Sequence, residues 1–343
     1  MSKRPRLRLH LPRWARPLIV GADGRLPIVL AALAGRPTAT LHGQGLTVPV
    51  TLDDPQTVPG GALAWDGHLA AGAPPGLYDL LLTVNGAEWR EPNAVCIPPT
   101  DVDRLTLAHC SDLHLLKPGR GTMQDRTAHV REMIGRLNAQ RPDLVVCTGD
   151  LISRYDERKR PLSAAVIRWQ IDWLRQYLPG LAVPLFVTVG NHDVAFAAAR
   201  PHWYAAMGGE TGPAPDDWSV DWGPYHLAMP DCFAYYDDHN EVLETSFRPE
   251  QLSWLQRDLG AVPEDGVRLL FAHYDYRRQL PELLPSLRLD GFYYGHSDPL
   301  YPEVLRRHSI WDGHLPARLA YQLVRLHGRS VIAQDLISWD SLA

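Results

Sequence analysis

The feature that most constrains this chain is a series of short apolar segments that each end in polar residues of one kind. Five such segments follow residue 104, and the side chains after them are carboxylates, imidazoles and one amide. The segments are residues 105–110 before Asp112 and His114, 144–148 before Asp150, 183–189 before Asn191, His192 and Asp193, 267–272 before His273, and 291–294 before His296 and Asp298. Short apolar runs bounded by Gly and polar residues are typical of buried strands.

Amphipathic helices are predicted between these strands. Val130, Met133, Ile134 and Leu137 follow the i, i+3, i+4, i+7 spacing of one helix face. A second helix covers residues 167–178 and ends at Pro179-Gly180, and a third begins at Pro249 and ends at Gly260. Strands that alternate with helices predict an α/β domain, which we place at residues 104–343.

The first part of the chain has a different pattern. Residues 27–32, 38–42, 46–51 and 77–84 are β-prone runs between Gly and Pro clusters, and Asn85-Gly86 joins the last run to residues 87–97 as a hairpin. No helical periodicity interrupts these runs. They predict a smaller all-β, sandwich-like domain over residues 1–100, with a structural or docking role.

Charge and composition narrow the class of protein. The 343 residues carry 34 basic and 39 acidic side chains, a net charge of −5, so nucleic acid is an improbable partner. No apolar run approaches the roughly 18 residues of a membrane helix. Four cysteines are too few for a disulfide scaffold, which favours a reduced, cytoplasmic protein. Six of the first 16 residues are basic, and Arg6, Arg8 and His10 alternate with leucines at 7, 9 and 11, which favours a half-buried strand over a targeting peptide.

The polar residues after the strands are candidate metal ligands. In open α/β sheets the carboxyl ends of the strands form the ligand crevice, so these side chains should converge. Carboxylates, imidazoles and an amide oxygen together suit divalent ions of intermediate hardness. The set is large enough for two ions if one carboxylate bridges them. A glycine before a ligand, as at Gly149 and Gly190, lets the chain turn sharply off its strand.

Taken in order, these motifs resemble the calcineurin-like metallophosphoesterase superfamily. Its signature of D-x-H, G-D, G-N-H-[DE], an isolated H and G-H-x-H reads here as Asp112-x-His114, Gly149-Asp150, Gly190-Asn191-His192-Asp193, His273 and Gly295-His296-Ser297-Asp298. The resemblance implies a four-layer α/β/β/α sandwich with a dinuclear metal site. It implies that Asp112 and His114 bind the first metal and that Asp150 bridges both. It assigns the second metal to Asn191, His273 and His296.

The resemblance also implies a reaction. A hydroxide shared by the two metals would attack a phosphodiester or small phosphomonoester in line, and His192 would face the phosphate and assist as an acid. Asp193, the next residue, would support the charged form of His192, or it is a solvated turn acid. Substrate identity and oligomeric state are left open.

One position departs from the family pattern, because the last histidine of the signature is Asp298 here. Three alternatives are open: Asp298 coordinates the first metal, it is too short to reach it, or His308 or His314 replaces it. Coordination is the favoured alternative, and the added oxygen ligand would favour Mn or Fe, with Zn as a further option. The departure also keeps open a catalytically weakened scaffold or partner-binding protein. Trp218, Trp222 and Tyr225 are expected to pack a surface excursion rather than to stack on substrate.

Overall fold

The computed structural model describes most of the chain. The described residues are 9–21, 24–30, 35–58, 61–69, 73–100, 102–119, 122–196, 199–209, 216–231, 233, 247–273, 280–296, 302–315 and 319–338. Asp298 and residues 1–8 of the basic N-terminal segment therefore lie outside the described part.

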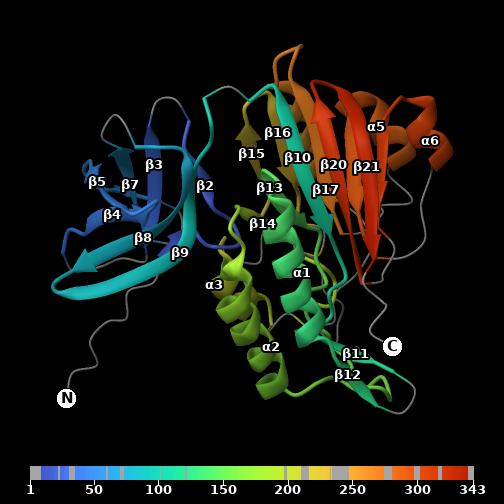
Figure 1. Cartoon of the computed structure of the whole chain (residues 1–343), viewed down its shortest axis with the longest axis horizontal. Helices are drawn as coiled ribbons and strands as arrows, with labels where there is room; N and C mark the ends of the chain where they lie inside the picture. The colour runs from blue at the N-terminus through green and yellow to red at the C-terminus, as the bar shows by residue number, and fades with distance from the viewer. Residues whose placement is uncertain are drawn as a thin grey trace.

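The N-terminal strands form one nine-stranded sheet in the order β1-β3-β7-β5-β4-β8-β9-β2, with β6 paired to β7 (Figure 1). The strands are β1 (Leu9–Leu11), β2 (Leu18–Ile19), β3 (Arg25–Leu30), β4 (Thr38–Gly43), β5 (Leu46–Leu52), β6 (Gln56–Thr57), β7 (Leu63–Leu69), β8 (Gly76–Val84) and β9 (Ala87–Ile97). One cluster of buried side chains, including Leu41, Trp65 and Leu80, comes entirely from this part of the chain. The sheet must therefore curl round its own core, instead of forming the two separate sheets of a sandwich.

The predicted hairpin is confirmed. Asn85 and Gly86 have φ angles of 49° and 75°, and Val84 pairs with Ala87 across the turn. Two consecutive positive φ angles define a type I′ turn, whose twist matches that of the flanking strands. The strand prediction for the basic segment is confirmed at β1, where the described residues begin.

The rest of the described chain contains two five-stranded sheets that pack face to face. The first has the order β14-β13-β10-β20-β21 and the second β15-β16-β17-β18-β19. The first comprises β10 (Arg104–Cys110), β13 (Leu144–Cys147), β14 (Leu185–Val187), β20 (Ala320–His327) and β21 (Ser330–Ser338). The second comprises β15 (Trp218–Trp222), β16 (Tyr225–Met229), β17 (Val267–Ala272), β18 (Gly291–Tyr294) and β19 (Trp311–His314). A short hairpin, β11 (Leu116–Pro118) and β12 (Met123–Asp125), lies apart from both.

Buried side chains fill the space between the two sheets. Leu107 and Phe186 of the first sheet share one core cluster with Leu269 and Phe271 of the second. Trp222 and Tyr225 belong to the same cluster, and Trp218 packs against it, so these aromatic residues are packed as predicted. They lie in β15 and β16 of the second sheet, however, and not in a surface excursion. Cys110 and Cys147 are buried free thiols in the neighbouring core.

Helices cover the outer faces of both sheets and complete four layers (Figure 1). They are α1 (Thr127–Gln140), α2 (Ala164–Tyr177) and α3 (Arg200–Met207) on the first sheet, and α4 (Pro249–Gly260), α5 (Leu280–Leu287) and α6 (Pro302–Arg307) on the second. The three predicted helices lie within α1, α2 and α4, and Pro179-Gly180 ends the second in a 3₁₀ turn (Leu178–Gly180). The predicted fold class, a four-layer α/β/β/α sandwich with a smaller all-β domain, is confirmed. No described helix has the length and apolar character needed to cross a bilayer.

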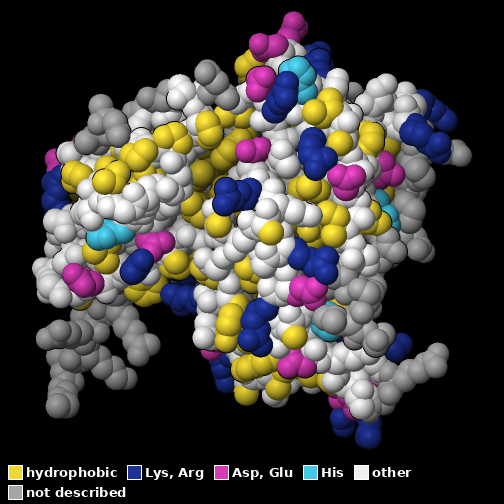
Figure 2. Space-filling model, viewed as in Figure 1, with side chains coloured by type: hydrophobic (Ala, Val, Ile, Leu, Met, Phe, Trp, Pro, Cys, Tyr) yellow, Lys and Arg dark blue, Asp and Glu magenta, His cyan; other side chains and the backbone are white. Residues whose placement is uncertain are grey.

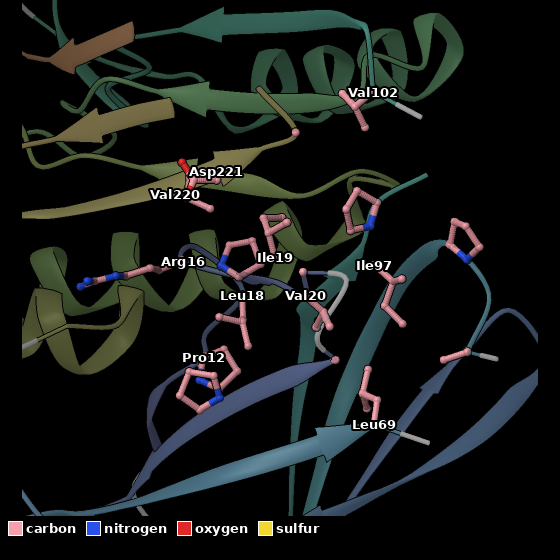
Figure 3. A pocket seen from close by; sticks show the side chains of 18 of the residues that line it. Pro12, Arg16, Leu18, Ile19, Val20, Leu69, Ile97, Val102, Val220 and Asp221 are labelled. Carbon is pink, nitrogen blue, oxygen red and sulfur yellow. The ribbon is translucent and has the colours of Figure 1, made fainter. Parts of the chain in front are cut away.

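A cavity of about 1100 Å³ separates the N-terminal sheet from β15 (Figure 3). Apolar side chains such as Leu18, Ile19 and Val220 line it, together with Arg16 and Asp221. None of its lining residues is among the predicted metal ligands. This cavity is therefore separate from the candidate metal site.

Candidate metal centre

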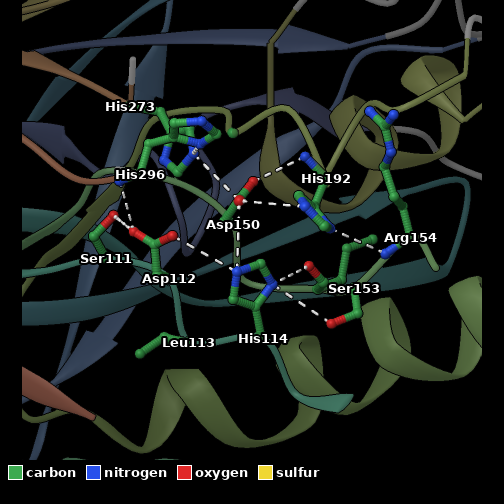
Figure 4. A network of polar contacts seen from close by, with 12 residues as sticks. Ser111, Asp112, Leu113, His114, Asp150, Ser153, Arg154, His192, His273 and His296 are labelled. Atoms are coloured by element: carbon green, nitrogen blue, oxygen red, sulfur yellow. Dashed lines mark hydrogen bonds and ion pairs between the residues drawn. The ribbon is translucent and has the colours of Figure 1, made fainter. Parts of the chain in front are cut away.

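The predicted ligands gather where the strands of the two facing sheets end (Figure 4). Asp112 and His114 follow β10, Asp150 follows β13, His273 follows β17 and His296 follows β18. The backbone leaves these strands abruptly. Asp112, His114, Asp150 and His296 all have positive φ angles, between 43° and 70°. Non-glycine residues rarely adopt this conformation, and it concentrates at functional sites.

Two glycines allow this close approach, as the sequence predicted. A Cβ atom at Gly190 would lie 2.2 Å from the backbone nitrogen of Asp150 and 2.3 Å from its Oδ1 atom. A Cβ atom at Gly295 would lie 2.6 Å from Oδ2 of Asp112. Any side chain at either position would displace a predicted ligand.

Two groups of potential ligand atoms share one carboxylate. His114, Asp150 and His192 form the first group and Asp150, His273 and His296 the second, with the ligand atoms of each group within 4.8 Å of one another. Oδ2 of Asp150 lies 3.6 Å from Nε2 of His114 and 3.2 Å from Nε2 of His273. Nε2 of His273 is also 3.2 Å from Nδ1 of His296. Asp150 thus lies where a bridging ligand would be needed.

Hydrogen bonds to backbone atoms determine the tautomer of each of the three imidazoles nearest Asp150. Nδ1 of His114 lies 3.2 Å from the carbonyl oxygen of Ile152, and Nδ1 of His273 lies 2.7 Å from that of Thr148. A carbonyl only accepts, so both rings carry a proton on Nδ1 and can offer Nε2 to a metal.

His192 has the opposite arrangement. Its Nδ1 atom accepts a hydrogen bond of 3.3 Å from the backbone N–H of Arg154. The neutral ring must then carry its proton on Nε2, which lies 4.0 Å from Oδ2 of Asp150. His192 therefore presents a donor toward the site although it lies within ligand distance.

Asp112 and Asn191 follow β10 and β14, and their roles as ligands stay predictions, since Asp112 belongs to neither of the two ligand groups. Oδ2 of Asp112 accepts hydrogen bonds from Oγ of Ser111 at 2.8 Å and from the backbone N–H of His296 at 2.9 Å. Its Oδ1 atom faces Nε2 of His114 at 3.6 Å. Asn191 is buried in the turn after β14, and the backbone N–H of its neighbour His192 donates to Oδ1 of Asp150 at 2.8 Å.

The donor set fits divalent cations. Asp112 and Asp150 are 2% and 1% exposed, and within the described part of the chain their carboxylates form ion pairs only with imidazoles. Burial raises the pKa of Asp150, but the facing His273, His192 and His114 outweigh it and hold the pKa below its usual range. For His273 the two effects have the opposite signs. Burial lowers the pKa of His273, but the facing Asp150 and Asp112 raise it to about 10. The local field therefore favours positive charge, which a bound cation supplies.

Asp193 has a structural position beneath the site. Its carboxylate accepts hydrogen bonds from the backbone N–H groups of Asp150, Leu151 and Ile152 at 2.9, 3.0 and 3.2 Å, and from Gly190 at 2.9 Å. It is fully buried, so it is not a solvated turn acid. Its described hydrogen bonds join the two ligand-bearing loops, and none of them reaches the ring of His192.

The fate of the last signature position stays a prediction, because Asp298 lies outside the described residues. Neither of its suggested substitutes belongs to the two described ligand groups. The ring of His314 packs against Tyr294 at 5.0 Å between centroids, and His308 is an exposed residue after α6.

Sequence reasoning missed two residues beside His192. The guanidinium of Arg154 stacks over the ring of Tyr155 at 4.3 Å, and that ring meets His192 edge-on at 6.4 Å. Burial lowers the pKa of His192 to about 4, and the nearby charge of Arg154 adds to this effect. The sequence feature that could have identified Arg154 is its position, four residues after Asp150 on the same loop.

Comparison with known proteins identifies the family. The model of the calcineurin-like phosphoesterase family matches residues 105–310, and the chain belongs to this family. No curated protein matches the chain. Among solved structures, a dimetal phosphatase from Danio rerio is 14% identical to this chain, with a TM-score of 0.49. The match covers 69% of this chain and 99% of the phosphatase chain. An amylomaltase from Corynebacterium glutamicum is 12% identical with a TM-score of 0.20, covering 40% of this chain and 21% of its own. These likenesses are too distant to bear on activity, whereas the family and the donor set support a metal-dependent phosphoesterase.

Proposed function

We propose that this protein is a dinuclear metal-dependent phosphoesterase that hydrolyses a phosphodiester or a small phosphomonoester. The observation that carries the proposal is the pair of potential ligand groups that share Asp150, the first of which includes His192 in a tautomer that offers Nε2–H in place of a lone pair. Ligands for metal ions and a hydrogen-bond donor aimed at the developing charge are the parts that hydrolysis of a phosphate ester needs.

The residues divide into ligands of two ions. Asp112, His114 and Asp298 would hold the first, Asn191, His273 and His296 the second, and Asp150 both. Two divalent ions, with Mn or Fe favoured, would supply Lewis acidity and lower the pKa of bound water. The carbonyls of Ile152 and Thr148 fix the rings of His114 and His273, so that each Nε2 lone pair stays directed at the site.

His192 serves the leaving group in this proposal. Its Nε2–H donates a hydrogen bond to the phosphate, or to the oxygen that leaves with the alcohol, and stabilises the negative charge that develops there while the ring stays neutral. The backbone N–H of Arg154 keeps the proton on Nε2 because it occupies Nδ1. The guanidinium of Arg154, held against Tyr155, adds positive charge near the place where the anionic ester binds.

Charge and architecture favour a small substrate. The net charge is −5, and basic and acidic side chains are interspersed on the face shown in Figure 2. Such a surface gives little attraction to a nucleic-acid backbone.

We place the catalytic domain at residues 104–343, the all-β domain at 1–100, and the protein in the cytoplasm.

The test is hydrolysis of bis(4-nitrophenyl) phosphate and 4-nitrophenyl phosphate by the full chain, with added Mn²⁺ or Fe²⁺ and with a chelator. We expect metal-dependent release of nitrophenol from at least one ester. Asp150→Asn should abolish it, and His327→Ala, a change at an exposed histidine at the far end of β20 from the site, should not. An inactive wild-type protein that binds metal would favour the scaffold alternative and refute the enzyme.

A further inference from the structure

Residues 13–16, here called the plug, leave the N-terminal sheet and enter the other half of the molecule. Arg13 and Arg16 close the plug through paired backbone hydrogen bonds of 3.2 and 3.0 Å. Trp14 and Ala15 are each 1% exposed and belong to the core cluster that otherwise consists of residues after 107. The plug is therefore packed as part of the domain to which the metal site belongs.

The N-terminal sheet anchors one side of the plug. The fully buried carboxylate of Glu91, on β9, accepts a hydrogen bond from the backbone N–H of Trp14 at 3.2 Å and lies 2.9 Å from Nε of Arg13. Arg13 also donates to the carbonyl of Leu9 at 2.9 Å. A buried ion pair with these additional hydrogen bonds fixes the plug in one position.

The other side of the plug contacts three elements of the metal-binding half. The carbonyl of Ala206, near the end of α3, accepts from a guanidinium nitrogen of Arg13 and from Nε1 of Trp14, both at 3.1 Å. Arg16 pairs with Asp216 at 2.9 Å just before β15. The backbone N–H of Val187 donates to the carbonyl of Ala15 at 3.0 Å.

The bond from Val187 matters most, because β14 ends there. β14 has only three residues and lies at the edge of its sheet, with β13 as its one strand neighbour in the described sheet. The N–H of Thr188 points toward β13 and donates to the carbonyl of Cys147 at 2.9 Å. Because successive residues of a strand face opposite sides, the N–H of Val187 points away from β13 and toward the plug. Five residues beyond Val187 the chain reaches His192.

We propose that the plug is a positioning element, which holds the end of β14 so that His192 faces the metal site. The inference rests on the proposed function and extends it, because it gives the N-terminal sheet a part in the reaction. The edge strand that leads to His192 is secured on one side by β13 and on the other by a segment from the opposite end of the chain. Loosening that segment should misplace His192, and with it the neighbouring Asn191, and leave the ligands that follow β10, β13, β17 and β18 in place.

The direct test is Ala15→Leu in the full chain, with Ala87→Leu at the exposed start of β9 as the matched control. Turnover per metal-loaded chain is measured with bis(4-nitrophenyl) phosphate and with diphenyl phosphate, whose leaving group is a poorer one. A misplaced hydrogen-bond donor costs more when the leaving oxygen develops more negative charge, so the loss should be about 10- to 100-fold on diphenyl phosphate and smaller on the nitrophenyl ester. A merely structural defect would slow both esters equally.

A milder variant keeps the test valid if Ala15→Leu does not fold. Trp14→Phe keeps a smaller aromatic ring in the core and removes the Nε1–H bond to Ala206. It should show the same selective loss, about two- to fivefold. Each plug variant combined with His192→Ala should lose little beyond His192→Ala alone, since both remove the same contribution.

The two levels of the proposal fail differently. Suppose that wild type is active. The positioning role is then wrong if the plug variants behave like Ala87→Leu, if they slow both esters equally, or if their loss of turnover adds fully to that of His192→Ala. The proposed phosphoesterase activity would stand in each of these cases. If wild type hydrolyses neither ester with any added metal, the proposed function is wrong and the positioning role falls with it.

Discussion

The Nδ1 atom of His192 lies 3.3 Å from the backbone nitrogen of Arg154, which donates a hydrogen bond to it. This bond distinguishes His192 from His114 and His273, whose Nδ1 atoms face carbonyl oxygens. Three imidazoles around one carboxylate are therefore chemically unequal. Two can present lone pairs to metals, and the third presents a proton.

The first prediction concerns the hydrogen-bond donor role of His192. His192→Ala should lower kcat for bis(4-nitrophenyl) phosphate by about 10²-fold and that for diphenyl phosphate by more, because removing one preorganised donor to developing negative charge costs about 10²–10³-fold. Initial rates with Mn²⁺ in excess provide the measurement, with His327→Ala as the control. Equal losses on the two esters would contradict a role of His192 at the leaving oxygen.

The second prediction concerns Asp193. Because its carboxylate accepts four backbone N–H groups of the two ligand loops, Asp193→Ala leaves those buried donors unpaired. We expect a loss of about 3–5 kcal/mol in the free energy of unfolding and weaker metal binding. Urea denaturation and metal titration measure both. An Asp193→Ala protein of wild-type stability that loses only turnover would instead support a direct catalytic role.

The third prediction compares two glycines. Gly190→Ala places a methyl group 2.2 Å from the backbone nitrogen of Asp150 and should abolish metal binding. Gly135 lies in α1 with nothing within 4 Å of a Cβ atom there. Gly135→Ala should stabilise the protein by about 0.5–1 kcal/mol, because alanine loses less backbone entropy in a helix. Denaturation curves and metal content of both variants decide the matter, and metal binding by Gly190→Ala would be inconsistent with the site geometry.

The fourth prediction concerns pH and a histidine remote from the metal site. His226 lies between Asp221, 2.7 Å from its Nδ1, and Asp258, 2.8 Å from its Nε2. Burial alone would lower the pKa of His226, but these two hydrogen bonds raise it to about 9. Because the folded pKa lies above the unfolded value of about 6.5, the stabilisation is complete below pH 6.5 and is lost as pH rises through 9.

Asp221 is 74% exposed, so solvent weakens this interaction and we expect about 1–2 kcal/mol. The measurement is the free energy of unfolding of wild type and His226→Gln between pH 6 and pH 9.5. The difference between the two proteins should shrink as pH rises. A difference that is constant with pH would show that His226 contributes no charge-dependent stability.

The sequence predicted those features that depend on neighbouring residues. The hairpin at Asn85-Gly86 follows from backbone preferences of two residues, and the helices α1, α2 and α4 follow from apolar spacing and terminal Pro or Gly. The convergence of Asp112, Asp150 and His273 was predictable as well, because the carboxyl ends of parallel strands share one edge.

Features that depend on long-range packing could not be predicted in this way. The bonds from Arg13 and Trp14 to Ala206 join residues more than 190 positions apart, and no local pattern records them. The role of Asp193 was misjudged for a similar reason, since its partners are backbone groups of another loop. Asp298 lies outside the described residues, so its coordination of the first metal stays a prediction.

The most direct test of the site is the number of metal ions per chain in wild type, Asp150→Ala and His192→Ala, measured by plasma mass spectrometry after loading with Mn²⁺ and gel filtration. We expect about two ions in wild type and in His192→Ala, and fewer than one in Asp150→Ala, because only Asp150 is shared by both ligand groups. Loss of metal from His192→Ala equal to that from Asp150→Ala would show that His192 is a ligand and would contradict the division of roles drawn from its tautomer.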